Sequence, residues 1–310
     1  MGHQIHDDEP DTSEATLRAL LQAECSQWSD LPAEYLQTSG TDNAMWRVRV
    51  DGGSDVVVRL PRRPRAAGLV AQETALLRAL SATRIGIVVS TPRVLHVGEP
   101  LEVFPHRWSV LSWLEGTDAW AARNTLDNDL RGLASDLGEA VLAIREIEDL
   151  PAPRRVPGER GGPIEPLVAR LYGWLDDPRW RAPELVDVDR VKQLAAEALV
   201  VADSPSACFV HGDLIPGNLL TRAGRLSAII DWGSAGYGDP AQDLSPAWSV
   251  LDSASRRAFR AIVGPDDGAW IRARTIELEH AVGGVLYYVP RGHALGDVMA
   301  RTLRRILEGE

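Results

Sequence analysis

The sequence predicts an α+β protein of two lobes, a small N-terminal lobe built on an antiparallel sheet and a larger, mostly helical C-terminal lobe. Alternating apolar runs on either side of "DGGS" are typical of a hairpin. Apolar stripes at helical spacing dominate the second half of the chain. The segment "LEGTD" between these regions breaks both patterns and indicates a hinge. We therefore place the lobes at residues 1–113 and 114–310.

The composition is that of a globular protein without a membrane or nucleic-acid partner. The chain has 310 residues, 45% hydrophobic and 25% charged, which is enough to bury a sizeable core. Its 33 basic and 44 acidic residues give a net charge of −11, which disfavours nucleic acids and suits a cationic small molecule. Two cysteines form no disulfide framework, and no apolar run is long enough to cross a bilayer. We expect a cytoplasmic protein.

The N-terminal lobe is expected to open with a helix around 13–25. Strands over about 44–50 and 55–60 form the hairpin, and proline residues stop the second strand. A helix follows over 68–80, and the runs "STPRVLHVG" and "RWSVLSW" supply two further strands. These elements together predict a small sheet with two helices.

The predicted helix over 68–80 carries an acid on its apolar face. The leucines of that face are Leu69, Leu76, Leu77 and Leu80. Glu73 lies in the middle of this stripe, where a carboxylate is costly unless it is paired. Arg59, at the end of "VVVRL", is the best candidate for its partner.

The C-terminal lobe begins with a long apolar stripe at helical spacing. Its members are Leu126, Leu130, Leu133, Leu137, Val141 and Ile144. The Pro/Gly/Arg-rich segment 151–163 is long enough to indicate a functional loop. Helices are expected over 164–175 and 184–201, followed by a short strand in "LSAIID" and by helices from Asp239 onward.

Three polar side chains at fixed spacing stand out in "HGDLIPGN" and "IDWG". Asp213 and Asn218 lie five residues apart, and Asp231 follows a buried apolar run. Their oxygens suit Mg²⁺, which needs only one or two protein ligands beside phosphate oxygens and water. Asn218 and Asp231 are the candidate ligands, and Asp213 is then free to face a substrate hydroxyl.

These motifs carry a resemblance to a known family. An Asp five residues before an Asn, followed by an Asp in "IDWG", resembles the catalytic loop and metal-binding Asp of protein kinases. The fuller pattern "HGDLIPGN", "IDWG" and "GDPAQDL" resembles the aminoglycoside phosphotransferase family, the antibiotic-kinase branch of the protein-kinase-like fold. The segments "SGTDNAMWRV", "VVVRLPRR" and "WSVLSWLEG" are also similar to that family. The resemblance covers about residues 15–290.

The resemblance implies a fold, an activity and a set of roles. The fold is the bilobal protein-kinase-like fold, and the activity is transfer of the γ-phosphate of ATP or GTP to a hydroxyl of a small molecule, an aminoglycoside-type antibiotic first. Asp213 is the implied catalytic residue, and Asn218 and Asp231 are the implied Mg²⁺ ligands. His211 and Asp243 are implied to hold the loop in shape.

The nucleotide-binding residues are implied in the same way. Arg59 would contact the phosphates while paired with Glu73, at a position where most kinase-like folds have Lys. The turn at Ser39, Gly40 and Thr41 would cover the phosphates. The hinge at Ser112, Trp113 and Leu114 would hold the base.

The sequence leaves the acceptor and several residue roles open. The acceptor could instead be a macrolide, choline, homoserine or a sugar, or the chain could be a nucleotide-binding pseudokinase that acts by interaction. Arg160, in "GERGGP", either lines the acceptor site or belongs to a plain connection between helices. The remaining candidates for substrate contact, with core packing or the surface as the alternative, are Glu277, Glu279, Tyr287 and Tyr288.

Overall fold

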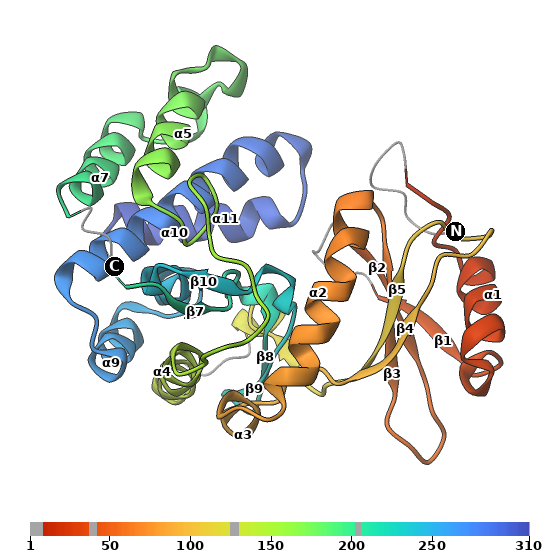
Figure 1. The fold of residues 1–310 in the computed structure, drawn as a ribbon. Coiled ribbons are helices and arrows are strands. Elements are labelled where there is room, and N and C mark those ends of the chain that lie inside the picture. Colours follow the sequence, from red (N-terminus) through yellow and green to blue (C-terminus); the bar gives the residue numbers. More distant parts are fainter. Residues whose placement is uncertain (1–8, 37–41, 125–129, 202–205, 310) are drawn as a thin grey trace. The chain divides into compact units, whose positions relative to one another are not determined.

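The computed structural model describes residues 9–36, 42–124, 130–201 and 206–309 (Figure 1). The chain divides into two compact units. The first comprises Met1–Gly86 and Ser90–Glu115, and the second comprises Ile87–Val89 and Gly116–Glu310. One unit holds a five-stranded antiparallel sheet and the other is mostly helical, which confirms the predicted α+β class.

The sheet of the first unit has the strand order β1-β2-β3-β5-β4, and all neighbouring strands are antiparallel. The strands are β1 Ala33–Leu36, β2 Asn43–Val48, β3 Val56–Pro61, β4 Val94–Gly98 and β5 Trp108–Ser112. The predicted hairpin is β2 and β3, shifted by one or two residues at its ends. The edge strand β1 escaped prediction because four residues are too few to establish an alternating pattern.

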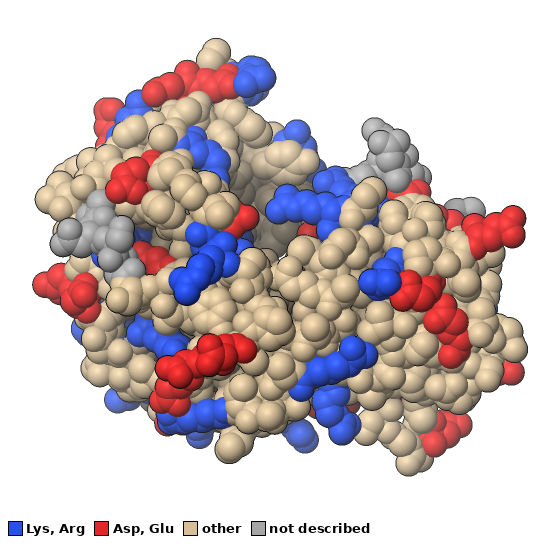
Figure 2. All heavy atoms as spheres, in the orientation of Figure 1, with Lys and Arg blue, Asp and Glu red and all other residues tan. Residues whose placement is uncertain are grey.

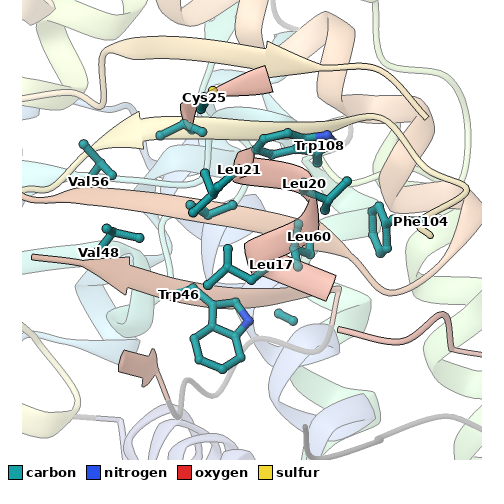
Figure 3. Close-up of a cluster of buried hydrophobic side chains, with 13 residues drawn as sticks. Leu17, Leu20, Leu21, Cys25, Trp46, Val48, Val56, Leu60, Phe104 and Trp108 are labelled. Carbon is teal, nitrogen blue, oxygen red and sulfur yellow. The ribbon is translucent and has the colours of Figure 1, made fainter. Parts of the chain in front are cut away.

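Helix α1 (Glu14–Glu24) covers one face of this sheet. Its N-terminus is capped by Ser13, whose hydroxyl accepts a hydrogen bond from the Thr16 N–H at 3.5 Å. Figure 3 shows its leucines against side chains of the sheet. The buried cluster includes Leu17, Leu20, Leu21, Cys25, Trp46, Val48, Val56, Val58, Leu60, Phe104, Trp108 and Val110. This cluster is the core of the first unit.

Helix α2 (Pro64–Leu80) lies on the opposite face. Because successive side chains of a strand alternate, Val58 of β3 joins the cluster under α1 while Arg59 faces α2. The helix begins four residues earlier than predicted, since Pro64 suits the first turn of a helix. Its buried stripe contains Val70, while Leu69 is only half-buried.

The second unit is mostly helical, and α10 is its central helix. The helices are α3 Ile85–Val88, which begins in the first unit, and then α4 Arg131–Arg145, α5 Ile164–Asp176, α6 Ala182–Leu185, α7 Val188–Val200, α8 Pro246–Ser249, α9 Ser253–Val263, α10 Asp267–Tyr288 and α11 Leu295–Leu307. Helix α10 contacts α5, α7 and α11. Its buried residues lie all round its axis, as expected of a central helix.

Two predicted helices of this unit differ from their observed forms. The helix predicted over 184–201 is two helices, because the Asp187 side chain accepts a hydrogen bond from the Arg190 N–H at 3.0 Å and starts α7. Helix α4 begins at Arg131, so Leu130 of the predicted stripe precedes its first turn. Leu126 lies outside the described residues.

Two small antiparallel sheets carry the candidate site. One contains β6 Thr117–Asp118, β8 Leu219–Arg222 and β9 Arg225–Ile229, and the other pairs β7 Cys208–Val210 with β10 Gly236–Gly238. The predicted strand in "LSAIID" is β9. Its partner β8 was missed, although the two-residue turn between them, with Ala223 at φ 50° and Gly224 at φ 75°, is a hairpin signal.

The surface is mixed in charge. On the face drawn in Figure 2, acidic and basic side chains lie in small interspersed groups. No helix formed by the described residues is both long and apolar enough to cross a membrane.

Candidate active site

The loop from His211 to Asn218 connects β7 to β8. Gly212 has a φ of 83°, and a Cβ at this position would lie 2.3 Å from the backbone oxygen of Ser234, so only glycine fits there. At the other end, the Ile230 N–H donates to the carbonyl oxygen of Asn218 at 3.0 Å. The loop is therefore fixed to the backbone at both ends.

A buried carboxylate supports the first half of this loop. Asp243 lies in a short 3-10 helix (Pro240–Leu244), and its two oxygens accept the backbone N–H groups of His211 at 2.6 Å and Gly212 at 2.9 Å. Burial raises the pKa of Asp243, while the hydrogen bonds from these two N–H groups act to lower it. The predicted supporting role of Asp243 is confirmed by this geometry.

The side chain of His211 is structural. Its Nδ1 accepts the Asp213 N–H at 3.2 Å, and its Nε2 lies 3.2 Å from the carbonyl oxygen of Ile230. Both contacts fit one neutral tautomer with the proton on Nε2. The ring is fully buried against Trp232, and burial lowers its pKa. His211 therefore remains neutral and holds the loop in shape.

The Asp213 carboxylate is held from two sides. Its Oδ1 accepts a hydrogen bond from the Arg160 guanidinium at 2.8 Å, and its Oδ2 accepts one from Nδ2 of Asn218 at 3.2 Å. The same amide nitrogen donates to the Asp213 carbonyl oxygen at 2.9 Å. The side chain keeps 20% of its exposure, so a small molecule can reach it.

Asn218 and Asp231 offer oxygen ligands for a hard cation. Because Nδ2 of Asn218 donates to Asp213, the amide is oriented and its Oδ1 is the atom left for a metal. Asp231 has a φ of 63°, a left-handed conformation uncommon for residues other than glycine and asparagine, of the kind that occurs at functional sites. An amide oxygen and a carboxylate fit Mg²⁺, which completes its shell with water and phosphate. Among the described residues, no cluster of three or more His, Cys, Asp or Glu suits a metal, so the metal role of Asn218 and Asp231 stays a prediction.

Residues 151–163, which we call the strap, run beside the loop and are tied to β10. The Arg155 N–H donates to the Tyr237 carbonyl oxygen, and the Tyr237 N–H donates to that of Pro153, both at 2.8 Å. Near the end of the strap, the Asp239 N–H donates to the Gly161 carbonyl oxygen at 2.8 Å. The strap is thus an ordered segment whose backbone is anchored on both sides of Arg160.

Arg160 also lines an open pocket of about 450 Å³ in the second unit. The lining comes from the strap, α5, the following turn and α10, and comprises Arg160, Arg170, Trp174, Trp180, Glu279, His280, Gly283, Gly284, Leu286, Tyr287 and Tyr288. Four of these are aromatic residues. The carboxylate of Glu279 is paired with Arg170 at 2.7 Å, so the lining holds no unpaired acid.

Two titratable groups of α10 have shifted pKa values: Glu277, buried beside the pocket, and His280, a half-buried residue of its lining. Burial raises the pKa of Glu277 to about 8, although the charge of Arg160 acts to lower it. Burial lowers the pKa of His280 to about 4, and Arg160 lowers it further. Nδ1 of His280 lies 3.8 Å from Oε2 of Glu277. Both pKa shifts favour the neutral forms near pH 7, so this is a contact between neutral groups.

In the first unit, Arg59 and Glu73 form the predicted pair. The guanidinium nitrogen Nη1 of Arg59 lies 2.6 Å from Oε1 of Glu73, and both side chains are buried. The prediction of a buried acid on α2 with its partner on the neighbouring strand is confirmed. The contact of Arg59 with nucleotide phosphates stays a prediction.

The predicted hinge residues are Ser112, which ends β5, and Trp113 and Leu114, which follow it. The Ser112 N–H donates to the Arg93 carbonyl oxygen at 2.9 Å, and the Trp113 N–H donates to the Asp55 carbonyl oxygen at 3.0 Å. Trp113 also stacks under the guanidinium of Arg47, 3.9 Å from its ring centre. Two of the three hinge N–H groups are therefore used within the unit. The candidate phosphate turn, Ser39, Gly40 and Thr41, lies outside the described residues.

Comparison with known proteins decides the class of this molecule. Residues 37–278 match the family described as the phosphotransferase enzyme family. The chain belongs to this family. The predicted family and a phosphotransferase activity are thereby confirmed. A search with the sequence finds no match among curated proteins.

Solved structures similar to this phosphotransferase share its fold. The GDP and kanamycin complex of APH(2″)-IIIa aligns with a TM-score of 0.71 at 18% identity, covering 94% of this chain and 97% of the other. The streptomycin–ATP complex of APH(2″)-IIa gives 0.57 at 16%, covering 91% and 97%. The macrolide 2′-phosphotransferase of Brachybacterium faecium gives 0.58 at 22%, covering 92% and 97%. The predicted kinase-like fold is confirmed by these likenesses.

Several residues of this phosphotransferase site were not found from the sequence. Trp174 and Trp180 were not among the candidates, because tryptophans are mostly core residues, yet both line the pocket. Arg170 and His280 drew no attention, because isolated bases on predicted helices are usually surface residues. Of the four α10 residues left open, Tyr287 and Tyr288 line the pocket with Glu279, and Glu277 is buried beside it. No local signal could have separated these positions from ordinary core positions.

Proposed function

We propose that this phosphotransferase moves the γ-phosphate of ATP or GTP to a hydroxyl of a small molecule, with Asp213 as the catalytic residue. The observation that carries the proposal is the place of Asp213. Its carboxylate is fixed by Asn218 at one oxygen and by Arg160, a residue of the pocket lining, at the other. Arg160 thus connects the proposed catalytic carboxylate to a pocket large enough for a small acceptor.

Asp213 would act by orienting the acceptor. The acceptor hydroxyl donates its hydrogen bond to the carboxylate, its oxygen forms the new bond to phosphorus, and the bond to the β-phosphate oxygen breaks. The hydroxyl proton passes to Asp213 and the nucleoside diphosphate leaves. Because this kind of transfer has a loose transition state, positioning dominates and a carboxylate of ordinary basicity serves. A backbone held by Asp243 and His211 suits that task.

Asn218 and Asp231 are proposed to hold Mg²⁺ with the nucleotide phosphates. When bound, the ion neutralises charge that develops on the transferred group. Arg59, aligned by Glu73, is proposed to contact the phosphates, and its planar fork can bind them through two hydrogen bonds. The base would contact the hinge through Leu114, because the N–H groups of Ser112 and Trp113 are already paired. The turn Ser39–Thr41 is kept as the candidate phosphate cover.

The acceptor proposed first is an aminoglycoside-type antibiotic. Similar structures hold kanamycin and streptomycin as ligands of their own proteins. A macrolide is the second candidate, and the pocket lining favours it. Its four aromatic side chains, and a single acid that is already paired with Arg170, suit an acceptor with large apolar surface and few positive charges. The cytoplasm, where ATP and GTP are available, is the proposed compartment.

A screen for nucleoside diphosphate release tests the proposal. Aminoglycosides and macrolides would each be offered with Mg·ATP and with Mg·GTP, and the product would be checked for one added phosphate by mass spectrometry. Asp213→Asn serves as the control, because it keeps the shape of the side chain and removes the carboxylate. If no acceptor raises release above the Asp213→Asn level with either nucleotide, the proposed function is wrong.

A further inference from the structure

We propose that Arg160 is a positioning residue that guards Asp213: it occupies the catalytic carboxylate until an acceptor fills the pocket, and so suppresses transfer of phosphate to water. This inference rests on the proposed function. It concerns a residue of the strap for which the sequence pattern left two readings open. The structure brings together two facts about Arg160, its bond to Asp213 and its place in the pocket lining.

The first step is the occupancy of the carboxylate. Arg160 donates to Oδ1 of Asp213 at 2.8 Å and Asn218 donates to Oδ2 at 3.2 Å. A water or an acceptor hydroxyl must donate to one of the same two oxygens in order to be oriented. Since Asn218 is buried and also bonded to the Asp213 carbonyl oxygen, it is the fixed partner. Arg160, whose side chain is 38% exposed, is the exchangeable one.

The second step is that only the side chain of Arg160 needs to move. The backbone on either side is fixed, because the Asp239 N–H donates to the Gly161 carbonyl oxygen at 2.8 Å and the Gly162 N–H donates to that of Glu159 at 3.0 Å. Asp239 is itself paired with Arg272 at 2.7 Å in a buried ion pair. A rotation of the Arg160 side chain releases Asp213 while the strap stays in place.

The third step is the charge around the guanidinium. The other acids near Arg160 are not available to hold it: Glu277 is protonated near neutral pH, and Glu279 is paired with Arg170. Among the described residues, Asp213 is the carboxylate that forms a salt bridge with Arg160. Ion pairs with this exposure are weak and exchange readily. An acceptor that presents oxygen atoms to Arg160 in the pocket can therefore draw it away from Asp213.

The consequence is a coupling between acceptor binding and catalysis. In the unwanted reaction, the oxygen of a water forms a bond to the γ-phosphorus and the bond to the β-phosphate oxygen breaks. Asp213 takes the proton of the water, and the nucleoside diphosphate and inorganic phosphate leave. With Arg160 in place, the guanidinium takes one lone-pair position of Oδ1, and its positive charge disfavours proton transfer from a water to the carboxylate there. With Arg160 drawn into the pocket by an acceptor, the acceptor hydroxyl takes that position.

Phosphate release without any acceptor tests this inference directly. The probes are Mg·ATP and Mg·GTP alone, with the full chain. We expect Arg160→Gln and Arg160→Met to raise release on the order of tenfold, because each frees a carboxylate whose full contribution is about 10²–10⁴-fold. Arg160→Lys retains a cation and should stay near the wild-type level. The double variant Arg160→Gln/Asp213→Asn should lose the gain.

Arg260→Gln is a matched control. Arg260 is a base of the same unit with 37% side-chain exposure, paired with the exposed Asp267 and absent from the pocket lining. Its loss should leave phosphate release unchanged. The guarding role is overturned if phosphate release is unchanged or lower in both Arg160→Gln and Arg160→Met. The same holds if no variant releases phosphate. The proposed function itself fails if no acceptor stimulates diphosphate release by the wild-type chain, which is a different observation.

With an acceptor in hand, the kinetic constants give a second readout. Arg160→Gln and Arg160→Met should raise KM for the acceptor, because the Arg160 guanidinium no longer offers hydrogen bonds in the pocket. In both variants kcat should change by less than KM. A purely structural role would instead lower the melting temperature and reduce kcat with no rise in acceptor-independent release. That outcome also overturns the inference.

Discussion

Asp243 accepts a hydrogen bond from the backbone N–H of His211 at 2.6 Å, and its second oxygen accepts that of Gly212. The carboxylate thereby fixes the two residues that precede Asp213, from a position 30 residues further along the chain. The side chain is fully buried, so neither N–H group has water as an alternative partner. This relationship gives the first prediction.

Asp243→Ala should destabilise the protein and remove most activity. Leaving two buried N–H groups without partners costs about 2–5 kcal/mol in the free energy of unfolding, measured by urea denaturation. Asp252→Ala, which removes only the N-cap of α9, is the control and should cost about 1 kcal/mol. Equal losses in the two variants would contradict the supporting role of Asp243.

Asp213→Asn should reduce kcat by about 10²–10⁴-fold while the protein stays folded, because the amide oxygen is a poor proton acceptor. The Asn218 amide can still donate to that oxygen, so the loop should keep its shape. Nucleotide affinity, followed as a thermal shift with Mg·ATP or Mg·GTP, should be unchanged. Near-normal turnover in this variant would remove Asp213 from the reaction.

Much of this site could be predicted because its residues are close in sequence. The loop from His211 to Asn218 and the Asp231 that follows are fixed by short-range spacing, and their pattern identified the family. The ion pair of Arg59 and Glu73 was also predictable, since a buried acid requires a partner on the neighbouring strand.

The pocket lining, our proposed acceptor side, could not be predicted, because it depends on tertiary packing. Arg160 reaches Asp213 from 53 residues away, and Arg170 of α5 pairs with Glu279 of α10 across 109 residues. Neither a strand-like alternation nor a helical period in the sequence indicates that residues so far apart are in contact. Trp174 reads as core because a tryptophan on an apolar helix face is usually buried there. Packing of α5 against α10 is what turns it toward the pocket.

The pair of Arg59 and Glu73 leads to a third prediction. Arg59→Lys should keep nucleotide-dependent activity, since a lysine still offers a cation to the phosphates, whereas Arg59→Met should raise KM for the nucleotide at least about tenfold. Both substitutions disturb a buried pair, so stability should be measured beside KM. Arg49→Met, at an exposed ion pair with Glu34 in the same unit, is the control and should leave the nucleotide KM unchanged. If Arg59→Met leaves the nucleotide KM unchanged, Arg59 has no role in phosphate binding.

Glu277 should make stability depend on pH, and the sign follows from the direction of its pKa shift. Its pKa is raised from 4.5 to about 8 by burial, so above pH 4.5 the folded chain holds a proton that the unfolded chain has released. The free energy of unfolding therefore falls as the pH rises toward 8, by up to about 1.4 kcal/mol per pH unit.

Glu277→Gln resembles the protonated side chain and lacks this dependence. Urea denaturation at pH 6.5 and 7.5 should show the variant gaining on the wild type by about 1 kcal/mol, because the titration of His280 affects both proteins alike and cancels in their difference. Glu165→Gln, at an exposed position in the first turn of α5, should keep a constant difference from the wild type across the same window. Parallel pH curves for Glu277→Gln and the wild type would mean that Glu277 is ionised in the folded protein. In that case Glu277 would be a second carboxylate available to hold Arg160.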